Sequence, residues 1–232
     1  MKLFETLSFG DLKLKNRMVM AAMTRSRANS NGVISDSTVT YYTQRSSAGM
    51  IISEAINISE QAIGSPLTPG IYTSEQINAW KKVTTSVHKN GGYIIAQLWH
   101  TGRLGHSIDK NGVLPVAPSA IPISGQQHFT SKGLQEFETP HELTVEEIGA
   151  IIKDYGKAAE NAIEAGFDGV EIHGANGYLP NQFLAESSNI RTDLYGGNIE
   201  NNSRFILEVV NEVANKIGSN KVGIKLSPLQ PY

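Results

Sequence analysis

The stretch DGVEIHGANGYLPNQF, residues 168–183, contains the change of pattern that is most informative about the fold. Val170 and Ile172 alternate with Glu171 and His173, and a period of two is typical of a β-strand. Glycines at positions 174 and 177 then interrupt the pattern. The stretch therefore predicts a strand that ends at His173 and continues into a glycine-containing loop.

Three polar side chains with different chemistry lie at the end of this strand: His173, Asn176 and Tyr178. An imidazole and an amide donate hydrogen bonds to an oxygen atom, and a phenol can release a proton. Each residue alone has an ordinary interpretation, as a satisfied polar group or a turn residue. The grouping favours a site that holds an oxygen atom and delivers a proton beside it.

Short apolar segments alternate with helical patterns along the rest of the chain. The predicted strands are Met18–Met23, Met50–Ile56, Tyr93–Trp99, 168–173 and Val222–Leu226. The predicted helices are Thr38–Ala48, Glu75–Asn90, Thr144–Gly166 and Asn202–Ile217. Nearly continuous apolar strands that alternate with helices predict a parallel sheet covered by helices.

Helix-end residues support these boundaries. Ser74 is the expected N-cap of the second helix, and Thr144 with Glu147 three residues later forms a capping box. Residues 3–16 are expected to form a small hairpin before the first strand. The stretch Gly102–Glu142 is rich in Gly, Pro and Ser, and we expect it to cross one face of the domain without forming a linker.

Polar residues occur where the predicted strands end: Thr24, Glu54, Gln97, His173 and Lys225. In a (β/α)-barrel the carboxyl ends of the strands form the active face. Five separate strands that place polar groups at one rim are a stronger indication of a site than any single residue. We therefore predict the functional site at this rim.

Composition excludes several classes of function. The chain has 232 residues and no cysteine, which excludes disulfides and cysteine chemistry. Its net charge of −2 gives no electrostatic reason to expect binding to nucleic acid or to an anionic membrane. His100 and His106 lack a carboxylate at metal-ligand spacing, so we predict no metal site. Met1–Thr6 is not an apolar leader, and a soluble, cytoplasmic protein without a membrane segment is expected.

The chain resembles the old yellow enzyme family of flavin-dependent ene-reductases. The resemblance rests on five stretches in family order: NRMVMAAMTRSR (16–27), YYTQRSSAGMIISE (41–54), QLWHTGR (97–103), EIHGANGY (171–178) and RTDLYGGNIEN (191–201). It implies a (β/α)8 TIM barrel that binds FMN, takes hydride from NADPH or NADH, and reduces activated C=C bonds by ping-pong hydride transfer.

The resemblance also implies residue roles. It assigns flavin contacts to Met23, Thr24, Ala55, Gln97, His173 and Lys225. His173 and Asn176 would hold the carbonyl or nitro oxygen of the substrate, since fixed donors stabilise the negative charge that develops there. Tyr178 would donate the proton, and a phenol gives it up only as carbanion character develops.

The sequence departs from the family in two respects. Lys225 stands where family members carry Arg, which keeps the charge but loses the planar fork. Residues 1–232 contain about five of the eight strand–helix units of a barrel, without the last loops that commonly bind phosphate, and 229–232 do not resemble the family's continuation. We expect one FMN-binding domain whose C-terminal part is missing, either by truncation or because a second polypeptide completes it.

The expected partners are small molecules: enals, enones, nitro-alkenes, quinones or nitro compounds. An oligomer or a barrel-completing chain stays open, as does the choice between NADPH and NADH. The alternative to an active ene-reductase is an inactive or partner-dependent fragment of such an enzyme, which is motivated by the missing phosphate loops.

Overall fold

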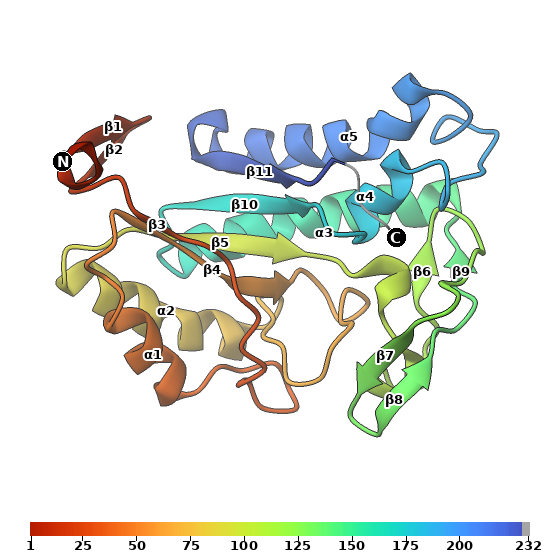
Figure 1. Ribbon diagram of the computed structural model, residues 1–232, viewed down its shortest axis with the longest axis horizontal. Coiled ribbons are helices and arrows are strands. Elements are labelled where there is room, and N and C mark those ends of the chain that lie inside the picture. Colours follow the sequence, from red (N-terminus) through yellow and green to blue (C-terminus); the bar gives the residue numbers. More distant parts are fainter. Residues whose placement is uncertain (229–232) are drawn as a thin grey trace.

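Five parallel strands form the central sheet of the molecule (Figure 1). They are β3 (Val19–Met20), β4 (Met50–Asn57), β5 (Ile94–Trp99), β10 (Gly169–Gly174) and β11 (Val222–Leu226). They lie side by side in chain order, and every pairing is parallel. The structure, a computed structural model, describes residues 1–228, and the segment 229–232 lies outside the described residues.

Helices connect these strands and form an arc around the sheet (Figure 1). They are α1 (Asp36–Thr43), α2 (Ser74–Lys89), α3 (Val145–Glu164), the short α4 (Leu179–Leu184) and α5 (Ile199–Ile217). In β5, Ile94, Ala96 and Leu98 are fully buried, and their period of two places them on one face of the strand. The predicted fold class, five of the eight units of a (β/α)8-type barrel, is confirmed.

Local sequence explains where the two longest covering helices begin. The predicted capping box of α3 is present, because Thr144 accepts a hydrogen bond from Glu147 N–H and the Glu147 side chain accepts one from the Thr144 N–H. In α2 the predicted N-cap is wrong by one residue, since Thr73 caps the helix in a box with Gln76. Either hydroxyl suits the position, and the backbone selects the one with extended geometry.

The remaining strands lie at the two ends of the sheet. The expected N-terminal hairpin is present as β1 (Leu7–Phe9) and β2 (Leu12–Leu14), beside the amino ends of the strands (Figure 1). The excursion over residues 102–142 lies at the carboxyl ends. It contains β6 (Val116–Ala117) paired with β9 (His141–Glu142), and the hairpin of β7 (Gln127–Thr130) and β8 (Gly133–Glu136).

Aromatic side chains pack the helices against one another and against the residue before β10. Trp80 of α2 is fully buried, and its ring lies 6.2 Å from that of Tyr42 on α1 and 5.3 Å from that of Phe167 before β10. Phe183 of α4 stacks on Phe205 of α5 at 4.3 Å. Such pairs favour one relative position of the elements. They therefore hold α1, α2 and the start of β10 together, and α4 against α5.

Candidate active site

Strand register decides which side chains share a level across the sheet. Ala55 of β4 is level with Gln97 of β5, which is level with Glu171 of β10. One step nearer the carboxyl end, His173 of β10 is level with Lys225 of β11. In parallel strands, registered residues point to the same face. Four of the residues predicted to contact a flavin therefore occupy two adjacent levels of one face.

Gln97 is held by an acidic neighbour. Its Nε2 donates a 2.7 Å hydrogen bond to Glu171 Oε1, and the residue is buried. A primary amide has two N–H donors and an acceptor oxygen. The contact with Glu171 therefore fixes the orientation of the amide and leaves its oxygen and a second N–H for another group.

His173 is a neutral imidazole in this structure. It is only 4% exposed, and burial, followed by the positive charge of Lys225, lowers its pKa from 6.5 to about 3. A neutral imidazole carries one N–H donor and one acceptor nitrogen. At neutral pH the residue can therefore donate a hydrogen bond without bringing a positive charge into the site.

Tyr178 lies between two other rings. Its ring centroid is 4.7 Å from that of His173 and 5.0 Å from that of Trp99, and both pairs meet edge to face. Edge-to-face contacts restrict how the phenol ring can turn. The strand residue His173 and the loop residue Tyr178, both predicted to belong to the site, are thus in contact.

The turn between His173 and Tyr178 has an uncommon backbone. Asn176 has a φ of 58° and Gly177 a φ of 76°, in the left-handed region, which asparagine and glycine tolerate better than most residues. The Asn176 N–H donates to Ser227 Oγ at 2.8 Å. The turn therefore reverses the chain directly after β10 and is tied to the segment that follows β11.

Gln182 of α4 supports the same turn. It is 1% exposed, and its Nε2 donates to the carbonyls of Gly177 (2.7 Å) and Thr101 (3.0 Å). Its Oε1 accepts from the Arg103 N–H at 3.2 Å. One buried amide thus joins the loop after β10 to the loop after β5.

The loop after β3 supplies the last part of the site. Thr24 and Met23 are exposed there, and the next residue, Arg25, donates its N–H to Glu54 Oε2 at 3.2 Å. Burial raises the pKa of Glu54 from 4.5 to about 7, although the hydrogen bonds from Arg25 and Tyr42 oppose the shift. Glu54 therefore attaches the loop after β3 to the end of β4.

A cavity of about 520 Å³ opens where these loops meet. Its lining includes Thr24 and Tyr178 together with Leu104, His128 and Phe129. His128 and Phe129 belong to β7, so the excursion covers this cavity. The structure thus brings the predicted Thr24 and Tyr178 to one space at the carboxyl end of the sheet.

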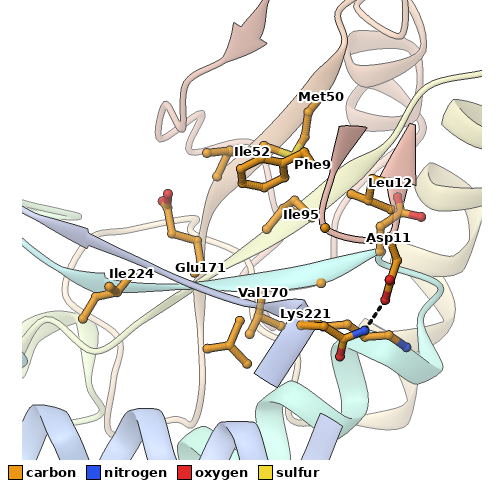
Figure 2. Close-up of a pocket in the computed structure, with 16 residues that line it drawn as sticks. Phe9, Asp11, Leu12, Met50, Ile52, Ile95, Val170, Glu171, Lys221 and Ile224 are labelled. Carbon is orange, nitrogen blue, oxygen red and sulfur yellow. Dashed lines mark hydrogen bonds between the residues drawn. The ribbon is translucent and has the colours of Figure 1, made fainter. Parts of the chain in front are cut away.

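A second cavity, of about 390 Å³, lies at the opposite end (Figure 2). The hairpin residue Phe9 lies beside Ile52 and Ile95 there, and most of the lining is apolar. Glu171 lines this cavity and also holds Gln97. None of the predicted catalytic residues lines it, so we place the chemistry at the carboxyl end.

Two buried nitrogen atoms at the site lack hydrogen-bond partners within residues 1–228: His173 Nδ1 and Trp99 Nε1. Buried polar atoms are normally paired, so these two indicate a place for a group with acceptor atoms. The carbonyl and nitrogen edge of a flavin ring has such atoms, and the residues present therefore fit the predicted cofactor. Across the described chain, no three His, Asp or Glu side chains gather to hold a metal ion.

Sequence reasoning missed three supporting residues. It placed Glu54 at the rim without a partner, and it gave Glu171 and Gln182 no role. The contacts of all three join loops or strands that are distant in sequence, so no local pattern indicates them. The one available clue in the sequence is that Glu171 and Gln182 stand among the apolar residues of EIHGANGYLPNQF, residues 171–183.

Comparisons with known proteins agree with this geometry. Residues 2–232 match the model of the NADH:flavin oxidoreductase / NADH oxidase family. The chain is 48% identical to the flavin oxidoreductase hxnT of Emericella nidulans, over 97% of this chain and 59% of that protein. It is 44% identical to a Leishmania infantum protein named "Probable flavin mononucleotide-dependent alkene reductase", over 99% of this chain and 64% of that protein.

A solved structure shows the same fold. The old yellow enzyme homologue from Zymomonas mobilis superposes with a TM-score of 0.95 at 44% sequence identity, and the match covers 98% of this chain and 64% of that one. The chain thus spans 59% to 64% of the length of these three relatives. No helix within residues 1–228 is both long and apolar enough to cross a membrane.

Proposed function

Because the chain belongs to the NADH:flavin oxidoreductase / NADH oxidase family, we propose that it is an FMN-dependent oxidoreductase that reduces activated alkenes with NADPH or NADH. The observation that carries the proposal is that Thr24 and Tyr178 line one cavity at the carboxyl end of the sheet, where the ring of Tyr178 contacts His173. The proposed unit is one flavin-binding domain over residues 1–232.

The flavin ring would be held by residues on the two levels described above. Gln97 offers the amide that Glu171 orients, and Ala55 beside it lets the backbone approach closely. Thr24 and Met23 come from the loop after β3, and Lys225 brings a positive charge next to His173. When bound, FMN supplies the hydride chemistry, taking hydride from the nicotinamide and passing it to the substrate.

His173 and Asn176 are the proposed holders of the substrate oxygen. Hydride addition to the β-carbon of an enone places negative charge on that oxygen, and donors fixed in advance stabilise it. The low pKa of His173 keeps its imidazole neutral, so the ring acts as a hydrogen-bond donor. The left-handed turn at Asn176 keeps this residue beside the end of β10.

Tyr178 is the proposed proton donor to the α-carbon. Its ring is held by His173 and Trp99, and it lines the cavity in which the substrate would lie. A general acid must be within hydrogen-bond reach of the atom that it protonates. Enals, enones and nitro-alkenes are the proposed substrates, because their activating oxygen can bind to the donors while the α-carbon faces the phenol.

The test is to purify the 232-residue chain, add FMN, and record the visible absorption spectrum before and after anaerobic addition of NADPH. We expect a bound flavin band that bleaches, and an added enone should restore it. One cavity serving both reactants in turn predicts parallel lines when both concentrations are varied, and intersecting lines would contradict the ping-pong order. A chain that stays colourless with FMN would favour a partner-dependent fragment.

A further inference from the structure

A small cationic cavity lies beside the proposed active site, between the loop after β3 and the start of α1. Its volume is about 190 Å³. Arg25, Arg27, Ser37, Thr38 and Tyr41 line it, and we call it the arginine pocket. The lining contains two guanidinium groups and three hydroxyls but no carboxylate. Whole-ligand pockets are usually larger, about 300–1,000 Å³, so this one suits a single anionic group.

Arg27 presents one edge of its guanidinium group without a partner. Its Nη1 donates to the carbonyls of Arg25 (3.1 Å) and Ser26 (3.0 Å). No hydrogen bond from its Nε or Nη2 reaches any residue in 1–228. These two atoms form the planar fork that binds phosphate or carboxylate with two parallel hydrogen bonds. The backbone thus holds one side of the group and leaves the other available to an anion.

Arg25 adds a second positive charge with few local contacts. Its guanidinium carbon lies 4.3 Å from the centroid of the Tyr41 ring, an arrangement typical of a cation–π contact. Within the described chain, its side chain donates no hydrogen bond. The N–H of Arg25 is held by Glu54, so the loop that bears both arginines has a fixed anchor.

The start of α1 contributes donors to the same cavity. The N-cap Ser35 makes no side-chain capping bond; instead its hydroxyl pairs with that of Ser37 at 2.8 Å. Thr38 is only 4% exposed, yet its hydroxyl has no hydrogen-bond partner among residues 1–228 although the residue lines the cavity. Free N–H groups and the helix dipole favour an anion at this end. The unpartnered hydroxyl of the nearly buried Thr38, a residue that lines the cavity, independently indicates one.

Nearby carboxylates do not neutralise the pocket. The side chain of Asp36 is 94% exposed and lies 3.9 Å from Lys82. Glu54 contacts Tyr42 and the backbone of Arg25. Neither residue lines the cavity. The charge of Glu54 acts on Arg25, whereas Arg27 has no ion pair with any residue in 1–228 and keeps its positive charge in the pocket.

Arg27 lines both the arginine pocket and the active-site cavity that contains Thr24 and Tyr178. We propose that the arginine pocket binds a phosphate group of the nicotinamide dinucleotide while its nicotinamide end occupies the active-site cavity. This inference rests on the proposed function. Two phosphates of a dinucleotide have the required chemistry: the 2′-phosphate, present only in NADPH, and the pyrophosphate, present in both NADPH and NADH.

The test uses ligands that lack nicotinamide, so that it needs neither flavin nor turnover. Binding of ADP-ribose and of 2′-phospho-ADP-ribose to the 232-residue chain is measured by calorimetry at low salt. We expect Arg27→Ala to weaken binding about tenfold or more, because a charge-assisted fork is lost. Arg27→Lys keeps the charge without the fork and should restore only part of the affinity. Thr38→Val should also weaken binding, because valine keeps the shape of the threonine side chain but lacks its hydroxyl.

Arg17→Ala is the matched control, since it removes the same charge at an exposed site that lies near Glu5. Binding of only the 2′-phosphorylated ligand would support a 2′-phosphate site, and equal, Arg27-dependent binding of both would support a pyrophosphate site. The proposal is overturned if the wild-type chain binds neither ligand, or if Arg27→Ala binds as tightly as Arg17→Ala does.

A flavin titration of the same variants, followed by visible absorption, separates this inference from the proposed function. A chain that binds flavin but neither phosphorylated ligand would overturn the arginine pocket alone. A chain that binds the phosphorylated ligands but no flavin would contradict the proposed function while supporting the pocket. Far-UV circular dichroism on each variant establishes that a loss of binding is not a loss of fold.

Discussion

The buried carboxyl group of Glu54 makes stability depend on pH. Its pKa is raised from 4.5 to about 7, chiefly by burial, so the folded chain holds a proton that the unfolded chain has lost between these values. The contribution of Glu54 to stability is therefore fully present below pH 4.5 and is lost as the pH rises through 7. The pKa difference corresponds to about 3 kcal/mol.

Glu54→Gln removes this titration while it keeps an amide of similar shape. We compare the free energy of unfolding of the variant with that of wild type at each pH. Relative to the difference near pH 4.5, the variant should gain about 3 kcal/mol over wild type above pH 7. Urea unfolding at several pH values measures this. Glu164→Gln, at a partly exposed carboxylate, is the control. If the free energies of unfolding of Glu54→Gln and wild type change with pH in the same way, Glu54 is not the source of the pH dependence.

Tyr178→Phe tests the proton donor. Because the phenol ring packs against Trp99 and His173, phenylalanine should keep the same place without the hydroxyl. We expect alkene reduction to fall about 10²–10⁴-fold, whereas the anaerobic reduction of bound flavin by NADPH should be unchanged. Stopped-flow measurement of each half-reaction distinguishes these effects. Tyr93→Phe, at the amino end of β5, is the control, and equal rates of alkene reduction would reject Tyr178 as the acid.

At the scale of elements, periodicity and capping residues predicted the long helices well. The helices α2 and α3 lie within one or two residues of their predicted bounds, and β11 matches its prediction. The short α4 was missed, because six residues cannot display a helical repeat. The hairpin β7–β8 was missed for a similar reason, since its turn is carried by Gly133 with a φ of 91° in a stretch without strand-like alternation.

Tertiary contacts explain what the sequence could not predict about the site. Strand ends identified the rim, and the resemblance supplied residue roles. The bond from Gln97 to Glu171 depends on how two strands, separated by α3 in the chain, align with each other. The bonds of Gln182 to two loops likewise depend on packing. Register and loop contacts leave no local pattern, so these supporting residues emerged only from the structure.

Thr73→Ala tests the capping box of α2. The Thr73 hydroxyl accepts a hydrogen bond from the Gln76 N–H, and the Gln76 side chain accepts one from the Thr73 N–H. Removing the hydroxyl should lower the free energy of unfolding by about 1 kcal/mol. Thr85→Ala, an exposed position inside the same helix, should be neutral or slightly stabilising because alanine has the higher helix propensity. Equal effects in urea unfolding would contradict a capping role.

At the scale of the whole molecule, the described sheet has two open edges. The strand β3 pairs only with β4, and β11 pairs only with β10. Apolar side chains are exposed at both, with Ile224 at 41%, Leu226 at 56% and Val19 at 48%. Open edges of this kind template pairing with another chain. The geometry therefore predicts that the 232-residue chain associates as its concentration rises.

Ile224→Lys tests this prediction, because a charge at an edge strand opposes pairing. We expect the variant to remain smaller than wild type in light scattering across a concentration series. Ile190→Lys, at an exposed apolar position outside the strands, is the control for a simple gain of charge. A wild-type chain that stays monomeric at high concentration would contradict the prediction.

The order of the strands in the sheet has a consequence for biosynthesis. Each strand of the central sheet pairs with the central-sheet strand that precedes it in the chain. When such a strand leaves the ribosome, its partner strand is therefore already outside. Chains are made at about 5–20 residues per second, far more slowly than a helix or hairpin forms. The sheet can therefore assemble one unit at a time during translation, and nascent chains of increasing length should gain protease resistance in steps at the ends of β4, β5 and β10.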